Sequence, residues 1–186
     1  MTIHAFILWR RIDRPGHDAC RLVRKSSGWV VEGAAAFRHE AGAASIVYRV
    51  ACDAHWRTIS GRVQGMIGFA AFDYRVAREG TVWTLNDKPA TGLDHLVDLD
   101  LGFTPATNLL QLRRVPILQG ETAALPAAWL DVEAGTLSEL AQIYERRSET
   151  AFWYAAPSVG YAGLLELAPN GFIRSYPGLW EAETSS

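Results

Sequence analysis

Two acidic and two basic residues lie close together in residues 95–114, an otherwise apolar segment, and such a group could support catalysis or ligand binding. Asp98 and Asp100 alternate with leucines, as they would on one face of a strand, which would place their side chains roughly 7 Å apart. Glycosidases use paired carboxylates separated by about 5 to 9.5 Å. Those acids normally come from different strands that flank a bound sugar, so the spacing alone is weak support for an enzyme.

Arg113 and Arg114 end the same segment. We expect residues 108–118 to form a strand, in which adjacent side chains face opposite sides, so that one arginine points inward. An inward arginine needs a partner because an unpaired buried charge is very unfavourable, and the two aspartates are the nearest acids. Two interpretations stay open: a structural ion pair, or an arginine available to bind a phosphate or carboxylate. Thr107 and Asn108, which precede this run, are turn formers whose side chains bond nearby backbone groups.

The chain is rich in aromatic residues, with seven Trp, six Tyr and seven Phe. Trp153 and Tyr154 are adjacent, so one of them should point inward, while Tyr176 and Trp180 lie close together near the C-terminus. Aromatic side chains usually fill a core. In an open sheet they also line sites for sugars and acyl chains, because they offer a large apolar face with a polar tip.

Several functional classes have little support. The five histidines show neither HxxxH nor HxH spacing, so no zinc site is predicted, and no GxSxG, GxGxxG or P-loop is present. We therefore expect no metal, no cofactor and no enzymatic activity. The net charge of −2, without a block of like charges, argues against nucleic acid as a partner.

The expected location is the cytoplasm. Cys20 and Cys52 have no metal-ligand spacing and should be reduced and buried. The apolar run near the N-terminus is too short for a secretion signal, and no apolar stretch is long enough to span a membrane.

The elements that would position these residues are mostly strands. The dominant hydrophobic period is two, and Gly, Pro or Asn-Asp residues bound the segments. We predict a single domain over residues 1–186, mainly β, with about nine to eleven strands in a curved antiparallel sheet, either a half-barrel or barrel-like. Hairpin turns are expected at residues 169–171, where Asn-Gly tolerates positive φ, and near residues 147–149.

Two segments could add one or two short helices. Residues 135–147 contain a capping-box pattern, Thr136 with Glu139, but they also alternate like a strand. We expect at most a helical turn there, passing into a strand at about Gln142. Residues 13–22 could form another short turn or helix.

Five motifs in order resemble those of a known family. They are PGHDACRL (15–22), YRVACDAHWRT (48–58), DLDLGFTPATNLLQLRR (98–114), QIYER (142–146) and NGFIRSYPGLW (170–180). The chain resembles the putative glycolipid-binding family of bacterial proteins, whose sheet is similar to that of the lipoprotein carriers of the bacterial envelope. The resemblance implies a glycolipid or other long-chain ligand and brings no catalytic activity with it.

The leading hypothesis is a protein that holds a glycolipid or other long-chain amphipathic ligand on the concave face of the sheet. Most of the predicted ligand-binding residues come from the family motifs. The full set is Asp98, Asp100, Thr107, Asn108, Arg113, Arg114, Tyr144, Glu145, Arg146, Tyr176 and Trp180.

Two further hypotheses stay open. A hydrolase of a glycoside or lipid would use Asp98, Asp100 or Glu145 as acid and base, and it needs a carboxyl group in an open cleft with a raised pKa. A scaffold subunit without a small-molecule ligand would lack a cavity and expose a large apolar patch. The oligomeric state and the identity of the ligand are open as well.

Overall fold

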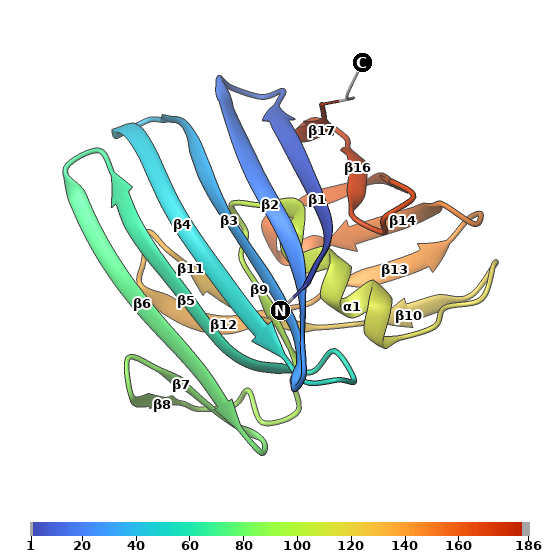
Figure 1. The fold of residues 1–186 in the computed structure, drawn as a ribbon, viewed down its shortest axis with the longest axis horizontal. Coiled ribbons are helices and arrows are strands. Elements are labelled where there is room, and N and C mark those ends of the chain that lie inside the picture. Colours follow the sequence, from blue (N-terminus) through green and yellow to red (C-terminus); the bar gives the residue numbers. More distant parts are fainter. Residues whose placement is uncertain (1, 184–186) are drawn as a thin grey trace.

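The structure, a computed structural model, describes residues 2–183 and is dominated by one large open sheet (Figure 1). Fourteen strands pair antiparallel in the order β10-β13-β14-β15-β16-β17-β1-β2-β3-β4-β5-β6-β7-β8, so the sheet ends at β10 and β8 and is not closed. The strands from the N-terminal half are β1 (Thr2–Arg11), β2 (Gly16–Lys25), β3 (Gly28–His39), β4 (Gly42–Cys52), β5 (Thr58–Ile67), β6 (Ala70–Glu79), β7 (Val82–Leu85) and β8 (Lys88–Ala90). Those from the C-terminal half are β10 (Thr122–Ala124), β13 (Ile143–Arg146), β14 (Ala151–Ala156), β15 (Tyr161–Leu167), β16 (Ile173–Tyr176) and β17 (Trp180–Ala182).

A second, smaller sheet and three helical segments complete the fold. The small sheet has the order β12-β11-β9, from β9 (Asp98–Asp100), β11 (Ala127–Asp131) and β12 (Thr136–Leu140). The β9–β11 pairing is parallel and the β11–β12 pairing is antiparallel. Among the described residues, the helical segments are the 3-10 turns η1 (Pro105–Thr107) and η2 (Pro157–Val159) and the α-helix α1 (Asn108–Arg114).

Strand alternation decides which face of the large sheet is buried. In β1, Ala5, Ile7 and Trp9 are buried, whereas Phe6 and Leu8 point to the opposite face and are exposed. Leu109 and Leu110 of α1 belong to the same buried core as the inward-facing residues of β1–β6. The C-terminal strands pack on the same helix through Leu112 and Val115. Because both halves of the sheet pack on α1, the helix lies on the concave side, and the core fills most of that face.

The predicted fold class is confirmed: the protein is mainly β, a single domain with one large curved antiparallel sheet. The predicted hairpins also form, between β13 and β14 and between β15 and β16. The predicted number of strands is too low, because several strands have only three to five residues and give no readable alternation.

Three local predictions are wrong. Residues 108–114 form helix α1, not a strand. Residues 136–140, where a helical turn was expected, form β12, because pairing with β11 outweighs the local capping pattern. Residues 13–22 were expected to form a short turn or helix, but only residues 13–15 form a bend; residues 16–22 belong to β2, which is hydrogen-bonded to neighbours on both sides.

Within residues 2–183, no helix has both the length and the apolar character needed to cross a membrane.

Candidate functional site

A cavity of about 320 Å³ lies where η1, the small sheet and the C-terminal strands meet. We call it the tyrosine cavity because three tyrosines, Tyr154, Tyr161 and Tyr176, contribute to its wall. Its other lining residues are Asp100, Gly102, Thr104, Pro105, Asn108, Trp129, Leu140, Val159, Leu179 and Trp180. Four of the residues predicted to bind ligand thus line one cavity, namely Asp100, Asn108, Tyr176 and Trp180.

Helix α1 and the preceding turn η1 form one side of this site. Neighbouring residues in the sequence determine where this helical segment starts and ends. Thr104 caps η1, because its Oγ1 accepts a hydrogen bond from the backbone nitrogen of Ala106 at 3.1 Å. Pro105 stands at the first helical position, where its missing N–H costs nothing. The helix ends at Val115, which is extended and precedes Pro116, a residue that disfavours a helical predecessor.

The two arginines of α1 have different surroundings. The sequence predicted this difference through strand alternation, whereas the structure produces it through helix geometry. On a helix, adjacent side chains are about 100° apart, so Arg114 turns toward the core while Arg113 stays exposed. Arg114 Nε donates to Asp98 Oδ1 at 3.0 Å, and its Nη2 donates to Asp98 Oδ2, which makes the contact bidentate. Arg113 donates to the carbonyl oxygen of Asn170 at 2.8 Å. The predicted aspartate–arginine ion pair is therefore present, and it occupies Asp98.

A chain of buried hydrogen bonds runs from α1 to Asp100. Asn108 Nδ2 donates to the Tyr144 hydroxyl, which in turn donates to Gln111 Oε1, both at 2.8 Å. Gln111 Nε2 donates to Gln142 Oε1, and Gln142 Nε2 donates to Asp100 Oδ2 at 3.1 Å. All five side chains are buried, so the chain fixes the orientation of the Asn108 amide and the Asp100 carboxyl at the cavity.

Asp100 differs electrostatically from Asp98. Burial raises the pKa of the Asp100 carboxyl to about 6, and the hydrogen bond from Gln142 only partly opposes this shift. At neutral pH the group is ionised without an arginine, and at mildly acidic pH it becomes a hydrogen-bond donor. It is the one carboxyl group among the lining residues.

The tyrosines of the cavity stay neutral. Burial raises the pKa of the Tyr161 hydroxyl to about 12 and raises the pKa values of Tyr154 and Tyr176 as well. Their rings lie 4.9 to 5.9 Å apart between centroids. The wall therefore combines aromatic faces with protonated hydroxyl groups that can donate or accept hydrogen bonds.

Some predicted site residues lie outside the cavity. Thr107 is buried and accepts a hydrogen bond from the Leu101 backbone nitrogen at 3.2 Å. Glu145 pairs with Arg147 at 2.8 Å near the surface. Arg146 donates to the carbonyl oxygens of Ile117, Ser148 and Glu149, which fastens the β13–β14 hairpin. These contacts connect elements of the fold, and none of the three residues reaches the cavity.

Sequence reasoning missed a second buried carboxyl group beside the cavity. Asp18, on β2, accepts hydrogen bonds from the Tyr48 hydroxyl at 2.9 Å and from Thr104 Oγ1. Burial raises the pKa of Asp18 to about 6. A sequence signal was available, because Asp18 alternates with Cys20 and Leu22 and so lies on the apolar face of its strand. Tyr161 gave no comparable signal.

Comparisons with known proteins give two matches and one negative result. The model of the family described as putative glycolipid-binding matches residues 6–182. A crystal structure of a DUF1089 family protein from Pseudomonas aeruginosa is similar, with a TM-score of 0.77 and 20% sequence identity, over 88% of this chain and 91% of that chain. At this identity the likeness shows the shared fold alone. No curated protein matches the chain.

Proposed function

Because the chain belongs to the putative glycolipid-binding family, we propose that it binds a glycolipid or another long-chain amphipathic ligand, whose polar head group enters the tyrosine cavity. One observation carries the proposal: an ionisable carboxyl group and a fixed amide converge with aromatic rings around one cavity. Asp100 and Asn108 provide the polar groups, and Trp129 and the three tyrosines provide the rings.

This combination of groups suits a sugar. A sugar ring has hydroxyl groups that require hydrogen-bond partners and C–H faces that pack against aromatic rings. The Asp100 carboxylate accepts hydrogen bonds from hydroxyl groups at neutral pH, while the Asn108 side-chain oxygen is a further acceptor. The Tyr161 hydroxyl donates to the Pro177 carbonyl oxygen at 2.8 Å, so toward a sugar it serves as an acceptor.

The size of the cavity limits what it can hold. Ligand pockets typically measure about 300 to 1,000 Å³, so 320 Å³ is at the lower end and suits a head group without its chain. The long chain would leave past Val159, which is exposed, and Leu179, which is half-buried; both residues line the cavity. In this proposal the concave face of the large sheet holds only the head group, because α1 and the small sheet cover the rest of that face.

The binding function is favoured over the two other hypotheses. A paired-carboxyl hydrolase needs a second acid in the cavity with Asp100, yet Asp98 is held by Arg114 and Glu145 pairs with Arg147. The remaining candidate, Asp18, accepts hydrogen bonds from Tyr48 and Thr104 and does not line the cavity. The scaffold hypothesis predicted no cavity, whereas the tyrosine cavity is present and has Asp100 and Asn108 in its wall. The cavity therefore favours the hypothesis that the protein binds a small molecule, and binding is the first function to test.

The test begins with protein purified under native conditions. An organic extract of this protein, analysed by mass spectrometry, should contain a lipid in stoichiometric amount, and a glycolipid panel should raise the melting temperature. Val159→Trp, at the mouth of the cavity, should abolish both effects. Val82→Trp, a comparably exposed valine on β7, should leave both unchanged. An empty extract together with no thermal shift across the panel would exclude the proposed function.

A further inference from the structure

The face of the large sheet that points away from α1 carries a second hollow, of about 680 Å³. We call it the outer groove. Its lining is mostly apolar and comes from five adjacent strands, β1–β5. It lies on the opposite side of the sheet from the core, because its exposed side chains alternate with buried core residues along each strand.

Strand register arranges the outer groove into two parallel rows. One row is apolar and crosses four strands through the paired positions Leu8, Ala19, Ala34 and Val47. The two alanines leave the floor low, while Leu8 and Val47 stand at the sides and are 44% and 51% exposed. A strip of this kind, running across the strands, suits an extended alkyl chain.

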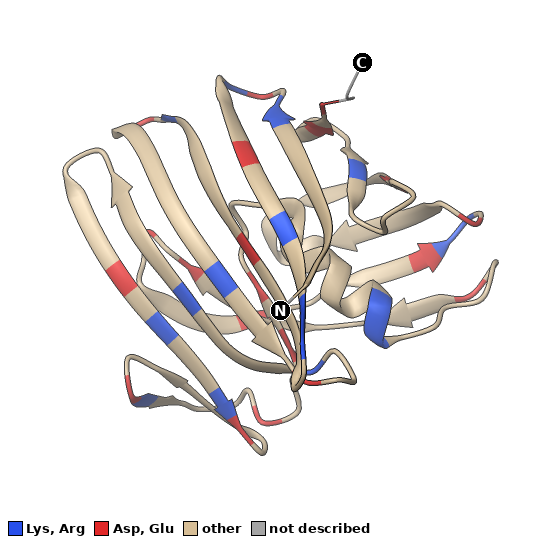
Figure 2. Cartoon of the chain, in the orientation of Figure 1, with Lys and Arg blue, Asp and Glu red and all other residues tan. Residues whose placement is uncertain are grey.

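The neighbouring row is charged. Its paired positions are Phe6, Arg21, Glu32, Arg49 and Arg62, and the next strand adds Arg75 opposite Arg62. Figure 2 shows these charged bands crossing β2 to β6. Phe6, at one end of the row, is 74% exposed and extends the apolar surface of the groove.

The charges in this row are not balanced. Arg21 and Arg49 share one carboxylate, Glu32, at 2.7 and 2.6 Å, and Arg62 pairs with Asp73 at 2.9 Å. Four arginines, with Arg75, therefore face two carboxylates, which leaves two positive charges in excess.

The arginines are also placed unfavourably with respect to one another. Arg49 lies directly opposite Arg62, and Arg62 lies directly opposite Arg75. Like charges at directly opposed positions of a sheet are destabilising. An anion bound between them would relieve this repulsion, so the row is suited to a negatively charged group.

From these two rows we propose that the outer groove binds a long-chain amphiphile with an anionic head group, a carboxylate or a phosphate. The alkyl chain lies along the alanine row between Leu8 and Val47. The head group is bound by Arg49 and Arg62. The proposal concerns a different face from the tyrosine cavity and does not depend on the function proposed for that cavity.

The probe for the test is palmitate below its aggregation concentration, with binding measured by isothermal titration calorimetry. Palmitate should bind at low ionic strength, and added salt should weaken binding, because the groove is exposed to solvent. Hexadecanol, which has the chain without the charge, and acetate, which has the charge without the chain, should both bind at least about tenfold more weakly.

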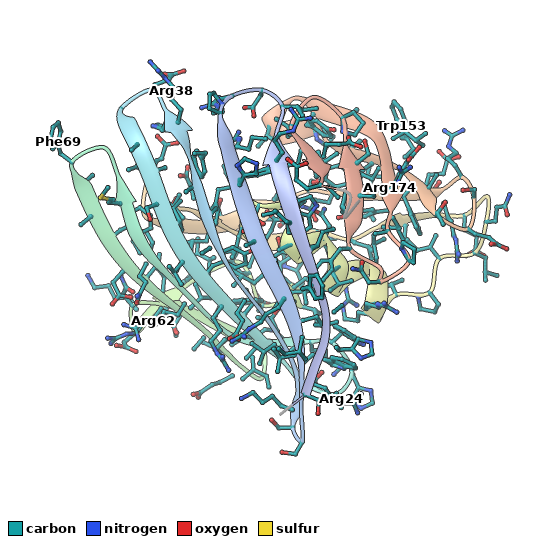
Figure 3. The ribbon with its side chains drawn as sticks, turned by 45° about the horizontal axis from the view of Figure 1, so that its top comes forward. Arg24, Arg38, Arg62, Phe69, Trp153 and Arg174 are labelled. Atoms are coloured by element: carbon teal, nitrogen blue, oxygen red, sulfur yellow. The ribbon has the colours of Figure 1, made fainter. Side chains whose placement is uncertain are left out.

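Matched variants locate the site. Arg49→Gln and Arg62→Gln should each weaken palmitate binding by about tenfold or more, as expected for the loss of a charge-assisted hydrogen bond. Arg38→Gln is the control, because Arg38 projects at the end of β3, well apart from Arg62 (Figure 3). Ala34→Trp should block the groove floor, whereas Ala36→Trp, one row further along the same face of β3, should leave binding intact.

All of these positions are exposed, so the variants should keep the melting temperature of the parent protein. The proposal is overturned if hexadecanol binds as tightly as palmitate, if acetate alone competes fully, or if the Ala34 and Ala36 variants behave alike. It is also overturned if the protein binds only to vesicles of anionic phospholipid and not to monomeric palmitate, since that result would indicate a membrane surface as the partner.

Discussion

Arg114, in the last turn of α1, forms a bidentate ion pair with Asp98 on β9 and thereby connects the helix to the small sheet. The Asp98 side chain is fully buried, whereas that of Arg114 is 21% exposed. This asymmetry matters because an arginine that loses its partner can turn toward solvent, while a buried carboxylate cannot.

The first prediction follows from that asymmetry. Arg114→Met should lower the free energy of unfolding by about 3 kcal/mol at neutral pH, because it leaves a buried carboxylate without a partner. Asp98→Asn should cost clearly less. The measurement is urea unfolding followed by circular dichroism. Arg113→Met, at the adjacent exposed arginine, is the control and should change stability by less than about 1 kcal/mol. A larger loss for Asp98→Asn than for Arg114→Met would contradict this account.

The second prediction concerns the hydroxyl group of Tyr144. It accepts a hydrogen bond from Asn108 and donates one to Gln111, so Tyr144→Phe leaves two buried polar groups without their partner. We expect the free energy of unfolding to fall by about 2 to 3 kcal/mol. Tyr74→Phe, which removes a single hydrogen bond from a half-buried hydroxyl to the Val132 carbonyl oxygen, should cost about 1 kcal/mol. Equal losses in the two variants would argue against the continuous hydrogen-bonded chain.

The third prediction is the pH dependence of stability that arises from Asp18. Its pKa is about 6 in the folded protein, above the ordinary aspartate value of 3.8, so the folded state binds more protons between these two pH values. The stabilisation is complete below pH 3.8 and is lost as the pH rises through 6. The loss amounts to at most about 3 kcal/mol.

Asp18→Asn tests this dependence directly. The amide oxygen can still accept a hydrogen bond from Tyr48, so the variant should fold and should be more stable than the parent protein above pH 6. Its stability should also depend less on pH between 4 and 6. Unfolding curves at several pH values in urea give both quantities. A variant whose pH profile is the same as that of the parent protein would exclude Asp18 as the titrating group.

The fourth prediction concerns ligand binding and rests on the proposed function. Asp100 is ionised above its pKa of about 6 and then accepts charge-assisted hydrogen bonds from sugar hydroxyls. Glycolipid affinity should therefore decrease as the pH falls from 7 to 5, by about tenfold for the loss of one such bond. Asp100→Asn should bind more weakly at pH 7 and should show a much flatter pH profile. An unchanged pH profile in this variant would remove Asp100 from the head-group site.

The sequence by itself determined the family, the class of fold and the main turns. Strands were predictable because a half-buried strand imposes a period of two on its own residues, as in residues 45–53. The turn at Asn170-Gly171 was predictable because positive φ restricts the residue type, and Gly171 has a φ of 89°. The need for an arginine–aspartate pair followed from the unfavourable energy of an unpaired buried charge.

Tertiary structure decided the rest. Residues 108–114 fit either a strand or a helix, since seven residues are too few for the apolar period to distinguish them, and packing of Leu109 and Leu110 in the core selects the helix. Residues 136–140 carry a helix-start pattern, but pairing with β11 makes them a strand. The free energies of local helix and strand preferences are small, so those of burial and strand pairing easily outweigh them.

The sites depended on tertiary structure even more strongly. Asp18 and Thr104 are 86 residues apart in sequence and are in hydrogen-bond contact, and no local pattern records that approach. The opposition of Arg49, Arg62 and Arg75 likewise exists only because three strands pair in one register. A sequence specifies the periodicity of each strand, whereas register and the approach of distant elements result from the packing of the whole chain.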